Sequence, residues 1–244
     1  MKSIKFSRRI GTFQLDRMMI GALMALAAVS GAQAWLAQHP HHDPWAPFNL
    51  NHPDGWATAM KRARMHADPR LCREVLERSD VAFATLAGQG DGDCQRDDLV
   101  VLPDLPLSPA DPSATCRTGA GMYEWMEKTV QPAAVETFGM KVAKVEHFGT
   151  YSCRRINNQP DGRWSQHATA NAIDIAAFVL EDGRRISIVQ DWQAMPESDD
   201  ARFLTIARDG ACNYFSTVLS PDYNAAHRDH FHLDQSSAYR GACR

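Results

Sequence analysis

The sequence predicts an α+β fold, a single domain in which helices pack on a small, mainly antiparallel sheet. Apolar and polar residues alternate with period two in residues 230–234, and residues 172–180 form a short apolar run, two patterns that are typical of strands. Apolar side chains recur every three or four positions in residues 121–138 and 201–215, which indicates helices. About 200 residues follow the N-terminal apolar segment, enough for one substantial hydrophobic core.

The strand over residues 172–180 should end at the turn Glu181-Asp182-Gly183 and pair with residues 184–189 as a hairpin. In residues 230–234, strand geometry directs His230 and His232 to one face of the sheet and Phe231 and Leu233 to the other. The sequence therefore places two imidazoles side by side on one surface.

The helical pattern over residues 121–138 contains Pro132, which predicts a break or a new first turn, and Gly139 is a suitable C-cap. Further helices are expected at residues 57–65, 71–78 and 201–215. Residues 88–98 are rich in Gly and Asp and should form a turn, and the four prolines of residues 103–112 predict an extended loop. No internal repeat is evident.

Four regions follow one another along the chain. Residues 1–17 form a basic tail, residues 18–36 contain no charged residue, residues 37–66 form a Pro-rich tether, and residues 67–244 form the domain. The tether carries His39, His41 and His42, and a stiff spacer is a simpler interpretation of it than a metal-gathering tract.

The uncharged run reaches the roughly 17 to 25 residues that cross a bilayer, and it is longer than the usual signal-peptide core of about 7 to 15 residues. Trp35 lies where an interfacial aromatic residue is expected. We therefore favour a single-pass inner-membrane anchor with the C-terminal domain in the periplasm, as the positive-inside rule indicates. A signal peptide cleaved near Ala34 remains the alternative, because Ala32-Gln33-Ala34 is a small-x-small site.

The charge of the exported part argues against nucleic acid as a partner. After residue 36 the chain has 21 Lys and Arg and 28 Asp and Glu, a net charge of −7. Nucleic-acid binding depends on basic surfaces that neutralise phosphates.

The six cysteines all lie in the exported part, which indicates up to three disulfides in an oxidising compartment. We expect the pairs Cys72–Cys94, Cys116–Cys153 and Cys212–Cys243. A zinc-thiolate site is the competing interpretation, but the sequence has no Cys-x-x-Cys pair.

His167, Asp174 and the pair His230 and His232 predict a catalytic zinc site, because such a site takes three protein ligands and leaves one position for water. Asp174 lies between two apolar strand positions, where an isolated carboxylate would be costly unless a cation held it. His167 must come from the preceding loop. In the alternative interpretation, Asp174 caps a turn and the strand histidines are solvated.

These residues resemble the bacterial extensin-like C-terminal domain family, over about residues 116–244. The segments that carry the resemblance are residues 149–154, 165–168, 171–175, 182–184 and 229–234, with further single matches between them. The family resembles the clan of D-alanyl-D-alanine metallopeptidases, lysostaphin-type endopeptidases and hedgehog domains, which implies the same type of fold. The resemblance implies zinc bound by His167, Asp174 and His232.

By the same resemblance, His230 orients water or stabilises an oxyanion, and Arg154 holds the substrate. We also expect Ser165 to contact the substrate. Two departures from the family pattern lie in residues 165–171, the loop that carries His167 and is called the ligand loop below. Gln166 replaces an acidic residue and Ala170 replaces a glycine, so Ala170 would be strained if its φ is positive. The acidic base of the D,D-peptidases has no clear equivalent, and Asp229 and His230 are the candidates.

Three functions follow as expectations. The first is a zinc peptidase acting on peptidoglycan stem peptides as a carboxypeptidase or an endopeptidase. The second is a non-catalytic zinc-containing module that binds peptidoglycan. The third is a disulfide-stabilised envelope scaffold without metal, favoured if His167, Asp174 and His232 do not converge in space.

Overall fold

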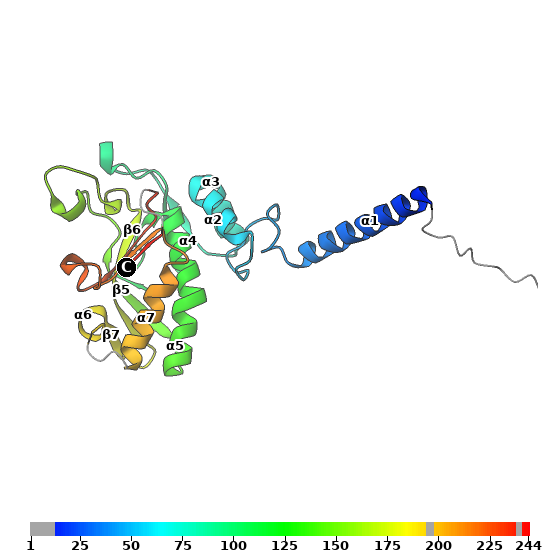
Figure 1. Ribbon diagram of the computed structural model, residues 1–244. Helices are drawn as coiled ribbons and strands as arrows, with labels where there is room; N and C mark the ends of the chain where they lie inside the picture. The colour runs from blue at the N-terminus through cyan, green and yellow to red at the C-terminus, as the bar shows by residue number, and fades with distance from the viewer. Residues whose placement is uncertain (1–12, 194–197, 238–240) are drawn as a thin grey trace, which may run out of the picture. The chain divides into compact units, whose positions relative to one another are not determined.

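The computed structural model describes residues 13–193, 198–237 and 241–244, and its contacts divide the chain into two units. One unit consists of Met1–Phe48 and His52–Arg62, and the other consists of Asn49–Asn51 and Ala63–Arg244. The second unit contains the sheets and all the candidate site residues (Figure 1).

The first unit begins with α1 (Gln14–Gln38), none of whose residues is buried. This helix is long and apolar enough to cross a membrane, although a signal sequence near an N-terminus passes the same test. After α1 the tether makes turns, and the Trp35 ring lies 5.7 Å from that of Trp56. The ring of His42 contacts both, at 5.1 Å from Trp35 and 4.6 Å from Trp56.

The helices expected at residues 57–65 and 71–78 are confirmed as α2 (Thr58–Ala67) and α3 (Pro69–Arg78). Helix α3 starts where it does because the Asp68 carboxylate accepts hydrogen bonds from the free N–H groups of Arg70 and Leu71. A small antiparallel sheet follows, with the strand order β1-β2-β4. Its strands are β1 (Ala84–Leu86), β2 (Leu99–Val101) and β4 (Ala114–Thr115).

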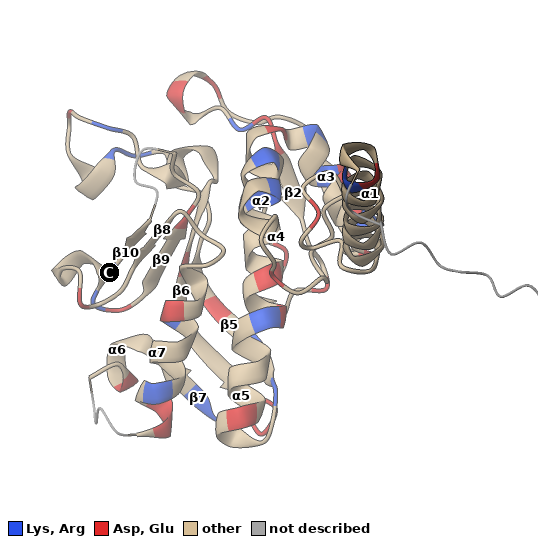
Figure 2. Ribbon diagram, turned by 45° about the vertical axis from the view of Figure 1, so that its right-hand side comes forward, with Lys and Arg blue, Asp and Glu red and all other residues tan. Residues whose placement is uncertain are grey.

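The larger sheet has the strand order β10-β8-β9-β6-β5-β3, and β7 pairs with β6. Its strands are β3 (Leu107–Ser108), β5 (Val142–Gly149), β6 (Ala172–Leu180), β7 (Arg185–Ser187), β8 (Thr217–Leu219), β9 (Phe231–Asp234) and β10 (Ala242–Cys243). The β3–β5 and β10–β8 pairs are parallel and the other pairs are antiparallel, so the expected mainly antiparallel sheet is confirmed (Figure 2). Strand β6 has the predicted bounds, and β7 is shorter than predicted because α6 (Ile188–Asp191) begins directly after it.

The helices over residues 116–138 form one column of three parts, namely α4 (Cys116–Trp125), the π-helical turn η2 (Met126–Val130) and α5 (Gln131–Phe138). Pro132 lies in the first turn of α5, and Gly139 ends it with a φ of 74°, as predicted. The column begins at Cys116 rather than at residue 121, because the Asp98 carboxylate accepts the Cys116 N–H and caps the helix from another element.

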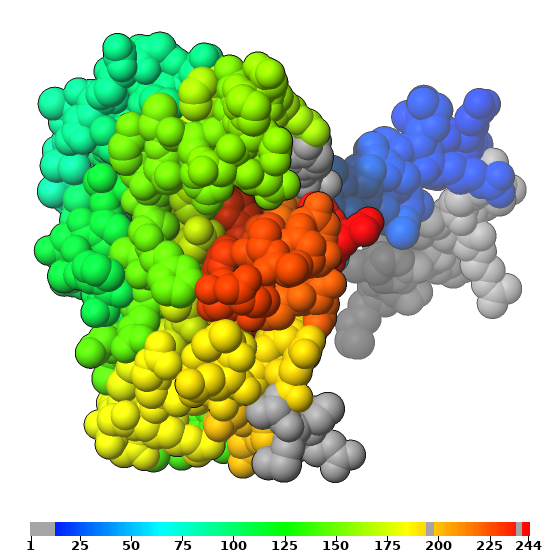
Figure 3. Space-filling model, turned by 90° about the vertical axis from the view of Figure 1, so that its left-hand side faces the viewer, coloured from blue at the N-terminus to red at the C-terminus, as the bar shows by residue number. Residues whose placement is uncertain are grey.

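Helix α7 (Asp199–Ala211) packs with this column on one face of the larger sheet. It ends at Ala211 rather than at residue 215, because the chain turns there to enter β8. The rings of Trp125 and Phe203 both contact Phe178 of β6 edge to face, and the indole N–H of Trp125 donates to the Ala207 carbonyl. The loops that follow β5 and precede β9, yellow-green and orange in Figure 3, lie together on one face of the molecule.

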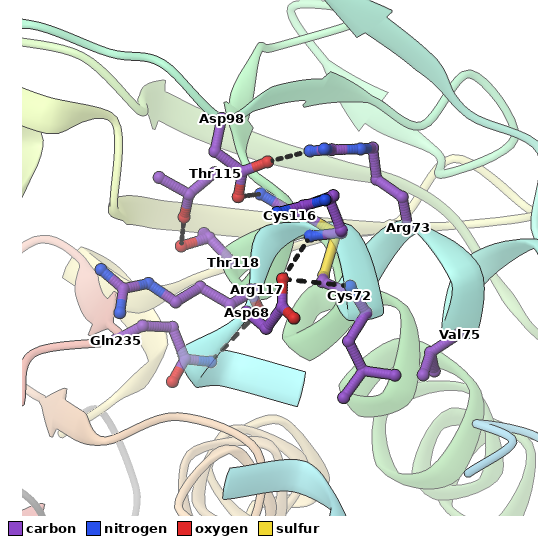
Figure 4. The surroundings of a disulfide bond; sticks show 12 residues. Asp68, Cys72, Arg73, Val75, Asp98, Thr115, Cys116, Arg117, Thr118 and Gln235 are labelled. Carbon is purple, nitrogen blue, oxygen red and sulfur yellow. Dashed lines mark hydrogen bonds and ion pairs between the residues drawn. A yellow bond between two sulfur atoms is a disulfide. The ribbon is translucent and has the colours of Figure 1, made fainter. Parts of the chain in front are cut away.

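Three disulfides form, but two of the expected pairings are wrong. The structure joins Cys72 to Cys116 and Cys94 to Cys153, and it confirms Cys212–Cys243. Pairing of neighbouring cysteines was expected, whereas α3 and the start of α4 lie side by side and bring Cys72 to Cys116 (Figure 4).

The Cys72–Cys116 bond is buried, and Asp98 lies beside it (Figure 4). One Asp98 oxygen accepts from Arg73 at 2.6 Å, and the other accepts from the Cys116 N–H at 3.3 Å. Burial raises the pKa of Asp98, although Arg73 and the Cys116 N–H act against that rise. Disulfide and carboxylate together hold α3, β2 and α4 as one body.

Close helix packing yields a first prediction. A Cβ atom on Gly210 of α7 would lie 2.2 Å from Cγ2 of Thr129, so Gly210→Ala should lower the free energy of unfolding by roughly 1–3 kcal/mol. Urea unfolding measures this loss. The double variant Gly210→Ala/Thr129→Ala should recover part of this loss, because it removes the Thr129 Cγ2 and Oγ1 contacts at 2.2 and 2.6 Å and keeps only the Cβ contact at 2.9 Å. A double variant as unstable as Gly210→Ala would contradict this packing.

Candidate metal centre

The register of β6 against β9 places Asp174 directly opposite His232. Both side chains lie on the face of the sheet away from the core, because Ile173, Ile175 and Leu233 take the inward positions and are at most 1% exposed. The predicted alternation in residues 230–234 is therefore confirmed, and it aligns a carboxylate with an imidazole across two strands.

His167 reaches the same place from the short 3₁₀ turn η4 (Gln166–Thr169). Ser165 caps this turn, since its Oγ accepts the His167 N–H at 3.2 Å. The turn ends at Ala170, whose φ of 54° is left-handed, the strained conformation considered from the sequence.

The ligand loop is fixed from below by Asn171, which is fully buried. Its Oδ1 accepts from Thr115 Oγ1 at 3.0 Å and from Arg117 Nε at 2.8 Å. The Thr115 N–H also donates to the Ala170 carbonyl at 2.9 Å. These bonds attach the loop to the disulfide-linked start of α4.

Three atoms of His167, Asp174 and His232 converge. His167 Nε2 lies 3.2 Å from His232 Nδ1 and 3.1 Å from Asp174 Oδ1, and His232 Nδ1 lies 2.9 Å from Asp174 Oδ1. A tetrahedral zinc ion with ligands at about 2.0–2.1 Å places them about 3.3 Å apart. These three atoms could therefore hold a metal ion with small adjustments.

The other nitrogen of each ring is already committed to an acceptor. His167 Nδ1 donates to the Thr150 carbonyl at 3.1 Å, and His232 Nε2 donates to Asp234 Oδ2 at 2.9 Å. Asp234 is held in turn by the Ser236 N–H at 2.7 Å. Partners of this kind orient a metal-binding histidine and fix its tautomer, so both rings can present a lone pair to the centre of the cluster.

Hydrogen bonds among the side chains of His167, Asp174 and His232 shift the pKa values of Asp174 and His232 in the absence of a metal. Burial alone would lower the pKa of His232, but its hydrogen bonds with Asp174 and Asp234 outweigh burial and raise that pKa to about 9. Burial would raise the pKa of Asp174, yet hydrogen bonds from His167 and His232 hold it far below the usual range. The carboxylates therefore favour positive charge on His232, at the place that a cation would suit.

His230 stands beside the three converging atoms and not among them. Its Nδ1 lies 2.9 Å from Asp229 Oδ1, and its Nε2 lies 3.6 Å from Asp174 Oδ1. Asp229 thus orients the ring, and Nε2 faces the cluster. Both residues lie beside the candidate ligands, as predicted, while their catalytic roles stay predictions.

The two residues assigned to substrate binding take different positions. Arg154 lies near enough to His227 for its charge to lower the pKa of that histidine. The Ser165 hydroxyl caps the His167 turn, so its evident contribution is to hold the ligand loop. Substrate contact by either residue stays a prediction.

Sequence reasoning gave no role to His227 or Asp234. The ring of His227 lies 5.2 Å from that of His230 and 5.8 Å from that of His232, and burial with repulsion by His232 and His230 lowers its pKa to about 4. Asp234 could have been found, because it continues the period of two set by His230 and His232.

The pH dependence of stability tests the metal-free cluster. The raised pKa of His232 contributes stability that is complete below about pH 6.5 and is lost as pH rises through about 9, roughly 3 kcal/mol in all. Urea unfolding of chelator-treated protein should show this loss, and His232→Gln should flatten it. Equal slopes in the two proteins would contradict the coupling.

Replacing the outer partner of His232 tests its orientation. Asp234→Asn should weaken zinc binding about 10- to 100-fold, because the ring loses the carboxylate that fixes its tautomer. Competition with a chromophoric chelator measures the affinity. Asp209→Asn is the matched control, since that carboxylate lies in a surface pair with Arg208. Equal affinities in both variants would rule out the role of Asp234.

The comparisons with known proteins identify the family of the chain. No curated protein and no solved structure matches the chain. The family model described as extensin-like protein C-terminus matches residues 70–244, which begins well before the resemblance seen from the sequence at about residue 116. This match takes in all three disulfides and every residue of the candidate metal centre, and the chain belongs to the extensin-like C-terminal family.

Proposed function

We propose that the chain is a zinc-dependent peptidase that acts on peptidoglycan peptides in the cell envelope. The observation that carries this proposal is the convergence of His167, Asp174 and His232 with their ligand atoms 2.9–3.2 Å apart. That convergence removes the condition under which a metal-free scaffold was favoured. The choice of peptidoglycan as substrate rests on the resemblance to the D-alanyl-D-alanine metallopeptidase clan.

The donor set fits zinc. Two neutral imidazoles and one carboxylate form a common ligand set of catalytic zinc, and they leave a position for water. Bound zinc supplies polarisation of the scissile carbonyl and lowers the pKa of water to about 7. His167 Nε2, Asp174 Oδ1 and His232 Nδ1 would hold it.

His230 is the residue placed to move a proton. Its Nε2 faces the cluster, and its Nδ1 is held by Asp229, so the carboxylate stabilises the imidazolium that forms when Nε2 accepts a proton. The same ring can return the proton to the leaving amine. Asp229 acts through His230 in this scheme as a positioning residue.

Arg154 and His227 supply the substrate side of the site. Arg154 is a permanent cation that can hold a carboxylate or carbonyl of the peptide. The low pKa of His227, about 4, keeps its ring neutral near pH 7, so it can donate or accept a hydrogen bond without adding charge.

Helix α1 and the disulfides support a location in the cell envelope. We propose that α1 anchors the chain in the inner membrane and that the domain faces the periplasm, where three disulfides persist. Cleavage near Ala34, with release to the periplasm, is the alternative.

The second candidate function is a zinc-containing module that binds peptidoglycan without cleaving it. The side chain of Gln166 favours this candidate, because its amide oxygen accepts from Asn171 and it replaces the acidic residue of the family pattern. In this candidate Gln166 only supports the loop that bears His167. The two candidate functions therefore differ in whether the protein cleaves its ligand.

Site variants separate metal binding from catalysis. His167→Ala should lose both zinc and hydrolysis, whereas His230→Gln should keep about one zinc per chain and lose roughly 10²- to 10⁴-fold in rate. Zinc is measured by atomic emission and hydrolysis by chromatography of muropeptides from purified sacculi. A His167→Ala protein that is free of zinc and fully active would overturn the proposal.

The wild-type protein decides between the two candidate functions. New muropeptides that require zinc would support the peptidase, and their masses would identify the bond. Zinc with binding to sacculi and no new fragments would instead establish the binding module.

A further inference from the structure

A groove of about 370 Å³ lies next to the metal centre. It is lined by residues of β5, β6 and β7 and by Asp229, the partner of His230. Phe148 is 63% exposed on its wall, and the Phe148 ring contacts His230 edge to face at 5.8 Å. In Figure 3 the green, yellow and orange-red segments that bear these residues meet on one face. The groove is therefore continuous with the catalytic side of the site.

Two residues that line this groove each carry a buried polar atom without a hydrogen-bond partner among the described residues. Ser187 is 1% exposed and its Oγ is unpartnered. His147 is 8% exposed, its Nε2 is committed to the Pro109 carbonyl at 2.8 Å, and its Nδ1 is unpartnered. Buried polar atoms without partners are rare, and both of these belong to residues on the wall of the groove.

An ion pair crosses the groove between neighbouring strands. Glu146 of β5 accepts from Arg185 of β7, with both Nε and Nη2 at 2.8 Å from Oε2. Among the residues that the structure describes, Oε1 of Glu146 and Nη1 of Arg185 have no such bond. Both side chains are partly exposed, so each can also contact a ligand.

We infer that this groove binds a side chain that ends in both an ammonium and a carboxylate. The carboxylate would meet Arg185, the ammonium would meet Glu146, and the methylene stem would lie against Phe148 and Val189, which also lines the groove. This inference rests on the proposed function, because it assigns the groove to the substrate of that site. In peptidoglycan the amino acid with such a side chain is diaminopimelate.

A zwitterion fits this groove better than a single charge. A ligand with only an ammonium or only a carboxylate would compete for one partner of the Glu146–Arg185 pair and leave the other less well neutralised. A ligand with both charges extends the pair into a four-membered arrangement and keeps the net charge of the groove unchanged.

Two peptides that differ at one group test the inference. The full-length chain in detergent, loaded with zinc and carrying His230→Gln to prevent cleavage, is titrated calorimetrically with L-Ala-γ-D-Glu-meso-diaminopimelate and with L-Ala-γ-D-Glu-L-Lys. The lysine peptide lacks only the terminal carboxylate. We expect at least about tenfold tighter binding of the diaminopimelate peptide. Arg185→Gln should abolish this preference, and Arg184→Gln, whose residue pairs with Asp200, should keep it.

The outcomes of this titration either support or overturn the proposed subsite. Equal affinities for the two peptides, or no binding of either, would overturn the subsite. A preference that survives Arg185→Gln would assign the discrimination to another residue and overturn it as well. Since binding is measured without turnover, a preference in a protein that never cleaves sacculi would leave the subsite standing while the peptidase proposal fails.

Discussion

The pairing of β6 with β9 is the constraint on which the rest of the site depends. Its register sets Asp174 opposite His232, and a slip by one residue would turn Ile173 or Ile175 outward and bury the carboxylate. Exposing the buried Ile173 and Ile175 would be costly, and this cost fixes the register of β6 against β9. The same register keeps Asp174 opposite His232. The hydrophobic core and the metal centre are two faces of the same pair of strands.

The position of the third candidate ligand, His167, depends on contacts distant in sequence. His167 stands on a four-residue turn that could not hold a fixed position alone, and the buried Asn171 attaches this turn to Thr115 and Arg117. Cys116 lies between those two residues and is bound to Cys72. On the other side, the Ser152 N–H donates to the His167 carbonyl next to Cys153, which is bound to Cys94. Both disulfides thus end beside the ligand loop and stiffen it.

The local parts of this structure follow from the sequence, and the non-local parts do not. Strand β6, the cap at Gly139 and the outward direction of His232 follow from periodicity and turn chemistry, which act within a few residues. The start of α4 and two disulfide pairings were missed, because Asp98 and Cys72 come from other elements and nothing local announces them. Asp174 could be predicted as a candidate ligand from the sequence, because a carboxylate between two buried Ile residues is costly without a cation.

Electrostatics connect these observations with the proposed chemistry. Asp174, His167 and His232 bring three acceptor atoms close together, and the outer ring nitrogens are held by other acceptors. A proton reduces the repulsion between these acceptor atoms in part, and a divalent cation would reduce it more fully.

X-ray absorption at the zinc edge of the metal-loaded protein tests this claim most directly. We expect two imidazole nitrogens and one carboxylate oxygen at about 2.0–2.2 Å, a further light atom, and no sulfur. A shell that contains sulfur, or a single imidazole, would contradict it.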